Sequence, residues 1–373
     1  MLKKLGFYSL FLLIGGCLEP YEFIAHDNKP SLVVEAYISD KSFDETLLYP
    51  SDGRYFTVKL SETGDVTNTR AIPVTGAVVE LWSNDNEVWP YTEGVTGIYS
   101  LLDAEFKAQR GIQYKLRILL TDETVYESEW VSLPQVDAPP IGEVGFTETE
   151  RQTYIMESSE WVLKSIKGVS ANIQIPKNIS GGTIHYRWTY APMWIYVAPL
   201  ISRNSPVYKC WATDAFHLKS YGLQIDKSGR YVKDLFFFPT IRNERIFEKF
   251  SVLITQQVMN EPYYSFWKEM KDRNEGSALV DIPPYNLKTN FSSSSSSSSP
   301  SGEKNVSGFF GVVTEQAKQW YFKKEELSYG VENTLKADCL VNYGPGSPAE
   351  ECTDCRAYSF GIATTRKPAW WQD

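Results

Sequence analysis

Three observations predict a mainly β fold for this chain. Short runs of alternating apolar and polar residues recur along the sequence, separated by Gly, Asp and Asn. Aromatic residues make up 14% of the chain, including 23 Tyr and 11 Trp, which favours half-buried sheet surfaces. One clear stretch of helical periodicity appears late in the chain, so we expect two β-rich domains, the second with one amphipathic helix.

The first sixteen residues have the pattern of an export signal. Lys3 and Lys4 precede an apolar run of about ten residues, half the length of a membrane-spanning helix. Small residues then precede Cys17, which fits the narrow cleft of a lipoprotein signal peptidase. We expect residues 1–16 to be a lipoprotein signal peptide and Cys17 to carry covalent diacylglycerol and acyl chains such as palmitate. The alternative is an ordinary secretory signal with a chance cysteine.

Composition divides the rest of the chain into a tether and two domains. Residues 17–30 are polar, acidic and proline-bearing, as in a tether. Short, evenly spaced strands predict an antiparallel β-sandwich for residues 31–134. Prolines in and beside residues 135–140 predict an extended linker, and residues 141–373 then form a β-rich C-terminal domain.

Two stretches of the C-terminal domain depart from the strand pattern. Tyr263, Phe266, Trp267 and Met270 recur at spacings of three and four, which predicts a helix near residues 261–274. A run of serines at 292–301 cannot bury apolar surface, so we expect a mobile loop there.

The net charge argues against a nucleic-acid partner, and the hydropathy argues against a membrane-spanning helix after the signal. The net charge of −9 becomes −11 when the signal and its two lysines are removed, so a nucleic-acid partner is not expected. No apolar stretch after the signal reaches about twenty residues, so the lipid on Cys17 would be the anchor to an outer membrane.

Four cysteines remain for an oxidising compartment. Cys210, Cys339, Cys352 and Cys355 predict two disulfides, for which three connectivities are possible. We favour bridges that tie residues 339–355 to themselves and to the strand of Cys210. The alternatives are a redox pair within the Cys352–Cys355 motif and, less favoured, a zinc site, because the chain has only one CxxC spacing.

Catalytic motifs are missing from the sequence. Its three histidines, His26, His185 and His217, belong to no HExxH motif, and there is no GxSxG motif or phosphate-binding loop. A triad assembled in space stays open as an alternative. We therefore expect a protein that is not an enzyme and that has no metal site.

Aromatic residues are the remaining candidates for a binding surface. Trp188, Trp194 and Trp211, with Tyr190 and Tyr196, would form either a platform for a sugar or peptide or, as we favour, part of a sheet core. Trp370 and Trp371 would either dock on a partner or pin the C-terminus, and we favour pinning.

Several stretches resemble known protein groups. The strands PVTGAVVEL, GIYSL and GIQYKLRI are similar to immunoglobulin-like or transthyretin-like modules. Together with the cysteine signal, the helix EPYYSFWKEM and the ending CTDCR followed by TTRKPAWW, they resemble the Bacteroidota lipoproteins of domain of unknown function 4249. The resemblance covers nearly the whole chain after the signal. The serine run, and an isoleucine where leucine is commoner before Cys17, depart from the family pattern.

The resemblance implies a location and a partner, without an established activity. Members are outer-membrane lipoproteins, often encoded beside TonB-dependent (SusC-like) transporters, and acidic residues after the cysteine often accompany export to the cell surface. The expectation is a lipid-anchored, surface-facing accessory or ligand-capturing subunit of such a transporter, in contact with that β-barrel and with other envelope lipoproteins. The alternatives are a stand-alone glycan- or peptide-binding lipoprotein and a structural subunit of an envelope assembly.

Overall fold

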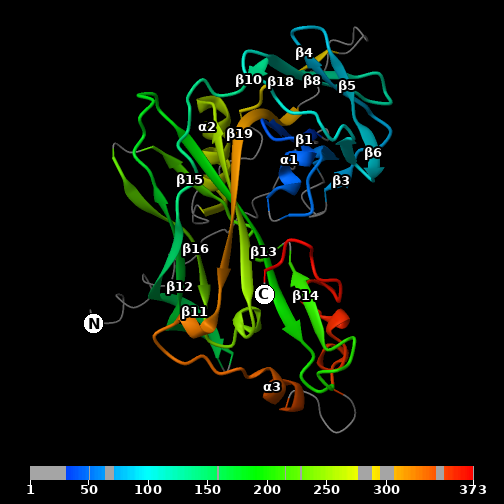
Figure 1. Ribbon diagram of the computed structural model, residues 1–373. Helices are drawn as coiled ribbons and strands as arrows, with labels where there is room; N and C mark the ends of the chain where they lie inside the picture. Colours follow the sequence, from blue (N-terminus) through cyan, green and yellow to red (C-terminus); the bar gives the residue numbers. More distant parts are fainter. Residues whose placement is uncertain are drawn as a thin grey trace, which may run out of the picture.

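Figure 1 shows a computed structural model of the chain, in which two β-sandwiches share one long sheet. The structure describes residues 31–49, 51–63, 71–157, 159–214, 216–226, 229–275, 288–294, 306–341 and 348–372. Strands make up 47% of the described residues and helices 12%, which confirms the prediction of a mainly β fold. The signal peptide, Cys17, the tether and His26 lie outside the described residues.

The first sandwich (blue and cyan in Figure 1) closes around one apolar core. Val34 and Leu60 from one sheet meet Leu81 and Leu116 from the other, all 1% exposed or less. One sheet contributes β1 (Leu32–Ser39), β2 (Phe56–Glu62), β3 (Ile72–Pro73), β6 (Thr92–Val95) and β7 (Ile98–Leu101), with helix α1 (Phe43–Leu47) after β1. The other contains β4 (Val78–Ser83), β5 (Val88–Pro90), β8 (Gln113–Leu119), β9 (Val125–Ser128), β10 (Val131–Ser132) and β18 (Phe291–Ser294).

The second sandwich has its own core, built around Trp188, Trp194 and Phe250. Its larger sheet contains β13 (His185–Val197), β14 (Lys209–Thr213), β15 (Gly222–Ile225), β17 (Phe250–Met259), β19 (Val306–Phe322) and β20 (Ile362–Thr364). The facing sheet contains β11 (Val144–Glu157), β12 (Glu160–Ile175) and β16 (Tyr231–Pro239). The remaining elements are helices α2 (Glu261–Glu275) and α3 (Leu335–Val341), with short 3-10 turns at Glu244–Ile246, Lys324–Glu326, Glu350–Cys352 and Cys355–Ala357.

Strand β19 (orange in Figure 1) connects the two sandwiches. Its first half, Val306 to Val313, pairs in parallel with β1, and its second half, Thr314 to Phe322, pairs antiparallel with β17. Strands β18 and β19 therefore complete a sandwich whose other strands precede the predicted linker. The two predicted segments, residues 31–134 and 141–373, are joined through one sheet.

The serine run is only partly outside regular structure. Phe291 to Ser294 form β18, which pairs antiparallel with Ser128 to Val125 of β9, so the predicted loop begins later than residue 292. Phe291 is buried in the first core and fixes the strand, while serine backbones supply ladder hydrogen bonds like those of any other residue. Residues 295–301 of the predicted loop lie outside the described residues.

The predicted helix is confirmed as α2. Its stripe packs Tyr263 and Phe266 against Phe309 and Val313 of β19. The helix therefore covers β19 near the position where that strand changes partners. None of the helices in the described ranges is long and apolar enough to cross a bilayer.

A polar network lies where β19 passes from one sandwich to the other. Arg54 Nη2 donates to Glu315 Oε1 at 2.9 Å, and Arg54 Nη1 donates to the Tyr37 hydroxyl at 2.6 Å. Gln257 Nε2 donates to Glu315 Oε2 at 3.4 Å, and Gln257 Oε1 accepts from Arg187 Nη1 at 2.9 Å. Burial raises the pKa of Tyr37 to about 12, so its hydroxyl stays protonated. The network links β1, β13, β17 and β19 through charge-assisted hydrogen bonds.

Candidate functional site

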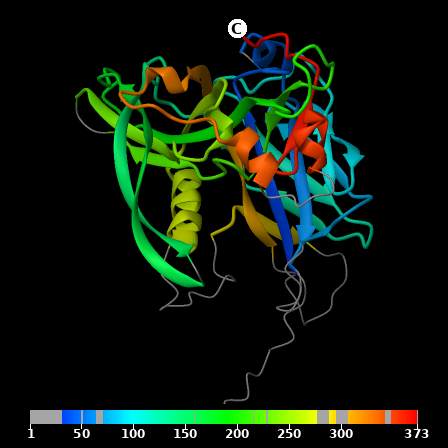
Figure 2. The ribbon, with the colours of Figure 1, turned by 90° about the horizontal axis from the view of Figure 1, so that it is seen from below.

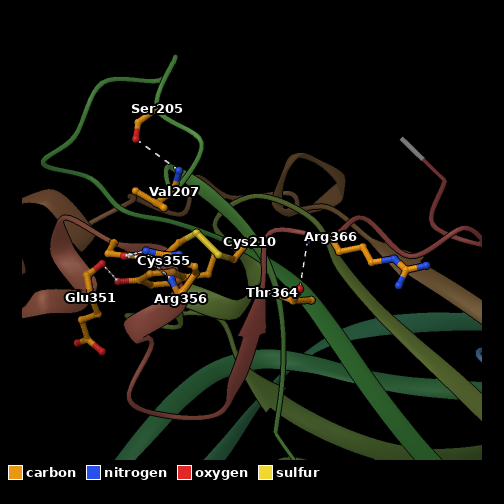
Figure 3. The surroundings of a disulfide bond; sticks show 10 residues. Ser205, Val207, Cys210, Glu351, Cys355, Arg356, Thr364 and Arg366 are labelled. Atoms are coloured by element: carbon orange, nitrogen blue, oxygen red, sulfur yellow. Dashed lines mark hydrogen bonds and ion pairs between the residues drawn. A yellow bond between two sulfur atoms is a disulfide. The ribbon is translucent and has the colours of Figure 1, made fainter.

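Two disulfides fasten the C-terminal segment to the second sandwich. Cys210 on β14 binds Cys355, and Cys339 on α3 binds Cys352, with Cα–Cα distances of 5.6 and 5.9 Å. Figure 3 shows the first bridge beside the edge of β14, where Cys355 N also donates to Val207 O at 3.0 Å. The favoured connectivity is confirmed. Cys352 and Cys355 have different partners, so the redox-pair and zinc alternatives are wrong for these thiols.

The C-terminal tryptophans hold the chain end against the sheet. Trp371 is 3% exposed and packs edge-on against Tyr321, with ring centroids 5.7 Å apart. Trp370 Nε1 donates to Asp52 Oδ1 at 3.2 Å, and Lys249 Nζ donates to the carbonyl oxygen of Gln372 at 2.5 Å. This is the pinning that the sequence favoured.

The other predicted aromatics form core rather than a platform. Trp188 and Trp194 are fully buried, and Trp211 is 8% exposed against Trp371. A sugar or peptide cannot stack on these rings, so the platform alternative is wrong for them. Both faces of the end of β13 are covered, with Trp194 and Tyr196 in the second core and Ile195 and Val197 against Trp211 and Trp371.

A cavity of about 250 Å³ lies beside the Cys339–Cys352 bridge. It is smaller than the usual range for ligand pockets, about 300–1,000 Å³. Its carboxylates already accept hydrogen bonds from neighbours: Glu244 from the Tyr358 hydroxyl at 2.7 Å, and Glu351 from Ser359 N at 2.8 Å. The lining residues are Tyr196, Arg242, Glu244, Phe247, Thr334, Leu335, Asp338, Cys339, Glu351, Cys352, Tyr358 and Phe360. This cavity offers a small molecule little polar contact that is not already used.

The two described histidines lie in packed surroundings. Burial, with the nearby Arg245 charge, lowers the pKa of His217 to about 4, against an opposing effect of Asp214. Its ring contacts those of Trp194 and Phe250 at centroid distances of 5.9 and 6.1 Å. Burial also lowers the pKa of His185, whose ring lies 5.0 Å from that of Tyr264. Both rings are neutral at pH 7 and are packed against aromatic side chains.

An exposed cluster of large apolar side chains lies on a projecting hairpin. Strand β16 pairs with β12 from Ile175 only as far as Gly168, so residues 150–157 and 160–167 continue as two strands alone. We call this segment the ribbon. In Figure 2 it extends away from the body toward the lower side of the picture.

Four large side chains share one face of the ribbon. Met156 is the cross-strand partner of Trp161, and Tyr154 is the partner of Leu163, so strand alternation places all four on the same side. Their exposed fractions are 54% for Met156, 67% for Trp161, 64% for Tyr154 and 48% for Leu163. We call these four side chains the apolar face.

Sequence reasoning missed the apolar face. The segment TYIMESSEWVL does not alternate apolar with polar residues, so periodicity assigned no strand to it and gave no indication of its exposure. The long unbroken pairing of β11 with β12, without a third strand beyond Gly168, is visible only in the structure.

The comparisons with known proteins give a family and no activity. The family model described as "Domain of unknown function (DUF4249)" matches residues 19–319. The chain belongs to this family. The DUF4249 match covers most of both sandwiches and ends within β19, before the disulfide-linked segment. Searches of curated proteins and of solved structures found no match.

Proposed function

We propose that this protein is a lipid-anchored, surface-facing outer-membrane lipoprotein that docks on a TonB-dependent (SusC-like) β-barrel transporter as an accessory subunit. It catalyses no reaction in this proposal. The observation that carries it is the apolar face, because exposed apolar clusters on soluble proteins are commonly protein-binding surfaces.

Three features support a location outside the cytosol and a docking role. Two disulfides are typical of proteins outside the cytosol, in agreement with the expected signal peptide and lipid on Cys17. The described histidines lie in packed aromatic surroundings rather than in a cleft with a nucleophile. The cavity beside Cys339–Cys352 is small and its carboxylates are engaged, so docking is better supported than capture of a ligand.

A structural subunit of an envelope assembly is the second candidate. The apolar face supports this role as well, since it would bind another envelope lipoprotein through the same side chains. The two candidates differ in the partner: a membrane-embedded barrel in the first and a peripheral lipoprotein in the second. The glycan-binding alternative has less support, because Trp188, Trp194 and Trp211 are buried.

Purification of the native complex tests the proposal. The membrane is extracted with mild detergent, the protein is recovered with antibodies, and its companions are identified by mass spectrometry. We expect a β-barrel of the TonB-dependent class in near-equal amount. Recovery of a lone monomer in several detergents would contradict the proposal, and recovery of peripheral lipoproteins alone would favour the second candidate.

A further inference from the structure

We infer that the apolar face of the ribbon is the docking surface for an integral protein of the membrane that anchors this chain. The inference rests on the proposed function and names the part of the molecule that makes the contact. Four steps support it: the ribbon lacks internal support, its apolar face is distinct from the core, it projects on the anchored side, and its end is acidic.

The ribbon exposes apolar surface that its own strands do not cover. Isolated two-stranded hairpins are marginally stable in water, and this one continues for about eight residues, or roughly 26 Å, beyond its third strand. Four large side chains exposed by about half or more approach the size of the largest apolar patches on monomers, which are often functional. A partner would remove this surface from water and support the hairpin.

The apolar face continues the inner face of the second sandwich but is separated from its core. On the same face, Phe146 and Val169 pack in the core, with Phe146 5.4 Å from the ring of Phe322. A polar band follows, in which Glu148 accepts a hydrogen bond from Ser328 N at 2.6 Å and Glu150 accepts one from Ser165 at 2.7 Å. The apolar side chains begin again only beyond this band. They form a second patch with a polar border, as protein interfaces do.

The ribbon projects on the side where the anchored segment enters the fold. Figure 2 shows the ribbon reaching the lower side of the picture, and β1 begins at Leu32 on that same side. The tether of residues 17–30 has fourteen residues and spans at most about 50 Å when extended. A lipid on Cys17 would therefore tether the molecule from the side on which the ribbon projects.

The end of the ribbon favours a protein partner over the bilayer. The last pair in the register joins Glu157 with Glu160, and Glu160 is exposed. A ribbon entering lipid with this end first would carry acidic residues into hydrocarbon, which is costly. A membrane protein can instead cover the apolar face and offer basic residues to the acidic end, whereas the ribbon of a second copy meeting it end to end would bring like charges together.

Site-specific photo-crosslinking tests the inference in the intact membrane. A photoreactive phenylalanine replaces Trp161 or Leu163 on the apolar face. The matched controls are Lys164, on the opposite face of the same strand, and Ile179, which is 91% exposed on a loop. We expect cross-links from positions 161 and 163 to an integral membrane protein, at least tenfold stronger than those from positions 164 and 179.

Substitution gives an independent measurement. The double variant Met156→Ala with Trp161→Ala should lose at least tenfold of the co-purified barrel, while Ile179→Ala retains it. Both variants should melt within a few degrees of the wild type, because the replaced side chains are largely exposed.

The outcomes separate this inference from the proposed function. If the wild type recovers a barrel and the double variant recovers as much, the docking surface lies elsewhere: the inference fails, while the recovered barrel itself supports the proposed function. If the wild type recovers no barrel, the proposed function fails. Cross-links from position 161 to a second copy of the chain, or Trp161-dependent binding of the purified protein to phosphatidylcholine–phosphatidylglycerol vesicles, would overturn the inference in favour of self-association or of lipid.

Discussion

Glu315 is the residue on which the junction between the sandwiches most depends. Its side chain is 2% exposed and binds Arg54 through both carboxylate oxygens. A buried carboxylate is stable only when paired, and here the pair also joins the loop before β2 to β19. The junction therefore derives its geometry from one ion pair as well as from the shared strand.

The variant Glu315→Gln should lower the free energy of unfolding by about 2–3 kcal/mol. Losing one partner of a fully buried pair costs about 3–5 kcal/mol, and the loss is smaller here because 35% of the Arg54 side chain is exposed. Urea titration measures the change. The control is Glu35→Gln, which breaks an exposed pair with Lys59 at 3.1 Å and should cost less than about 1 kcal/mol. Equal effects would contradict a special role of Glu315.

His217 should make stability depend on pH. Its pKa of about 4 in the folded state lies below the ordinary 6.5, so the unfolded chain binds the extra proton first. The contribution of neutral His217 is therefore fully present above pH 6.5 and is lost as the pH falls toward 4. In His217→Gln this part of the acid destabilisation should disappear, which urea midpoints measured between pH 4 and 7 would reveal. Parallel curves for variant and wild type would contradict the assignment.

Strand β19 contains a position that only glycine can occupy. Gly308 has a φ of +111°, and a Cβ there would lie 1.9 Å from the carbonyl oxygen of Val34 on β1. The position combines a backbone conformation that other residues rarely adopt with a direct contact between strands. Glycine is required there so that β19 can pair with β1.

Gly308→Ala should therefore destabilise the protein by more than the backbone conformation alone explains. The control is Gly111→Ala, where φ is +84° and nothing lies within 4 Å of the new Cβ. We expect about 1 kcal/mol for Gly111→Ala and at least twice that for Gly308→Ala, measured by thermal unfolding. Similar losses at both positions would show that the contact with Val34 relaxes freely.

The two disulfides should differ in their contribution to stability. The Cys210–Cys355 bridge closes a loop with a sequence separation of 145, and Cys339–Cys352 one of 13. Chain entropy predicts about 5 kcal/mol for the longer loop and about 3 kcal/mol for the shorter. Replacing each pair by alanine and measuring urea midpoints tests the order. A larger loss from the shorter loop would mean that contacts in the folded state, rather than chain entropy, decide.

Sequence patterns predicted individual strands and helices better than they predicted which strands pair. The strands PVTGAVVEL, GIYSL and GIQYKLRI correspond to β4, β7 and β8, and the stripe at Tyr263 identified α2, because these signals are local. The disulfides followed from four cysteines and a preferred connectivity. The pairing of β1 with β19 could not be predicted, since the strands are far apart in sequence and leave no local signal. The same limit hid the apolar face, whose exposure depends on where β16 ends.

The molecule as a whole should depend on Cys17 for its location. In Cys17→Ala the lipid cannot form, so we expect loss of labelling by radioactive palmitate and loss of the protein from the outer-membrane fraction. The fold should persist, since the residues of both sandwich cores come from Leu32 onward. Fractionation and mass spectrometry of the N-terminus measure the result. A variant that stays in the membrane without lipid would contradict a lipid anchor.

The shared strand also has a consequence for biogenesis. In the proposed export the N-terminus crosses first, so β1 and β2 would arrive long before β18 and β19, which complete their sandwich. Until residue 313 has crossed, the edge of β1 stays open and able to pair with another chain. We expect this protein to need a holding chaperone in transit, and a fragment that ends at the proline linker to aggregate rather than fold.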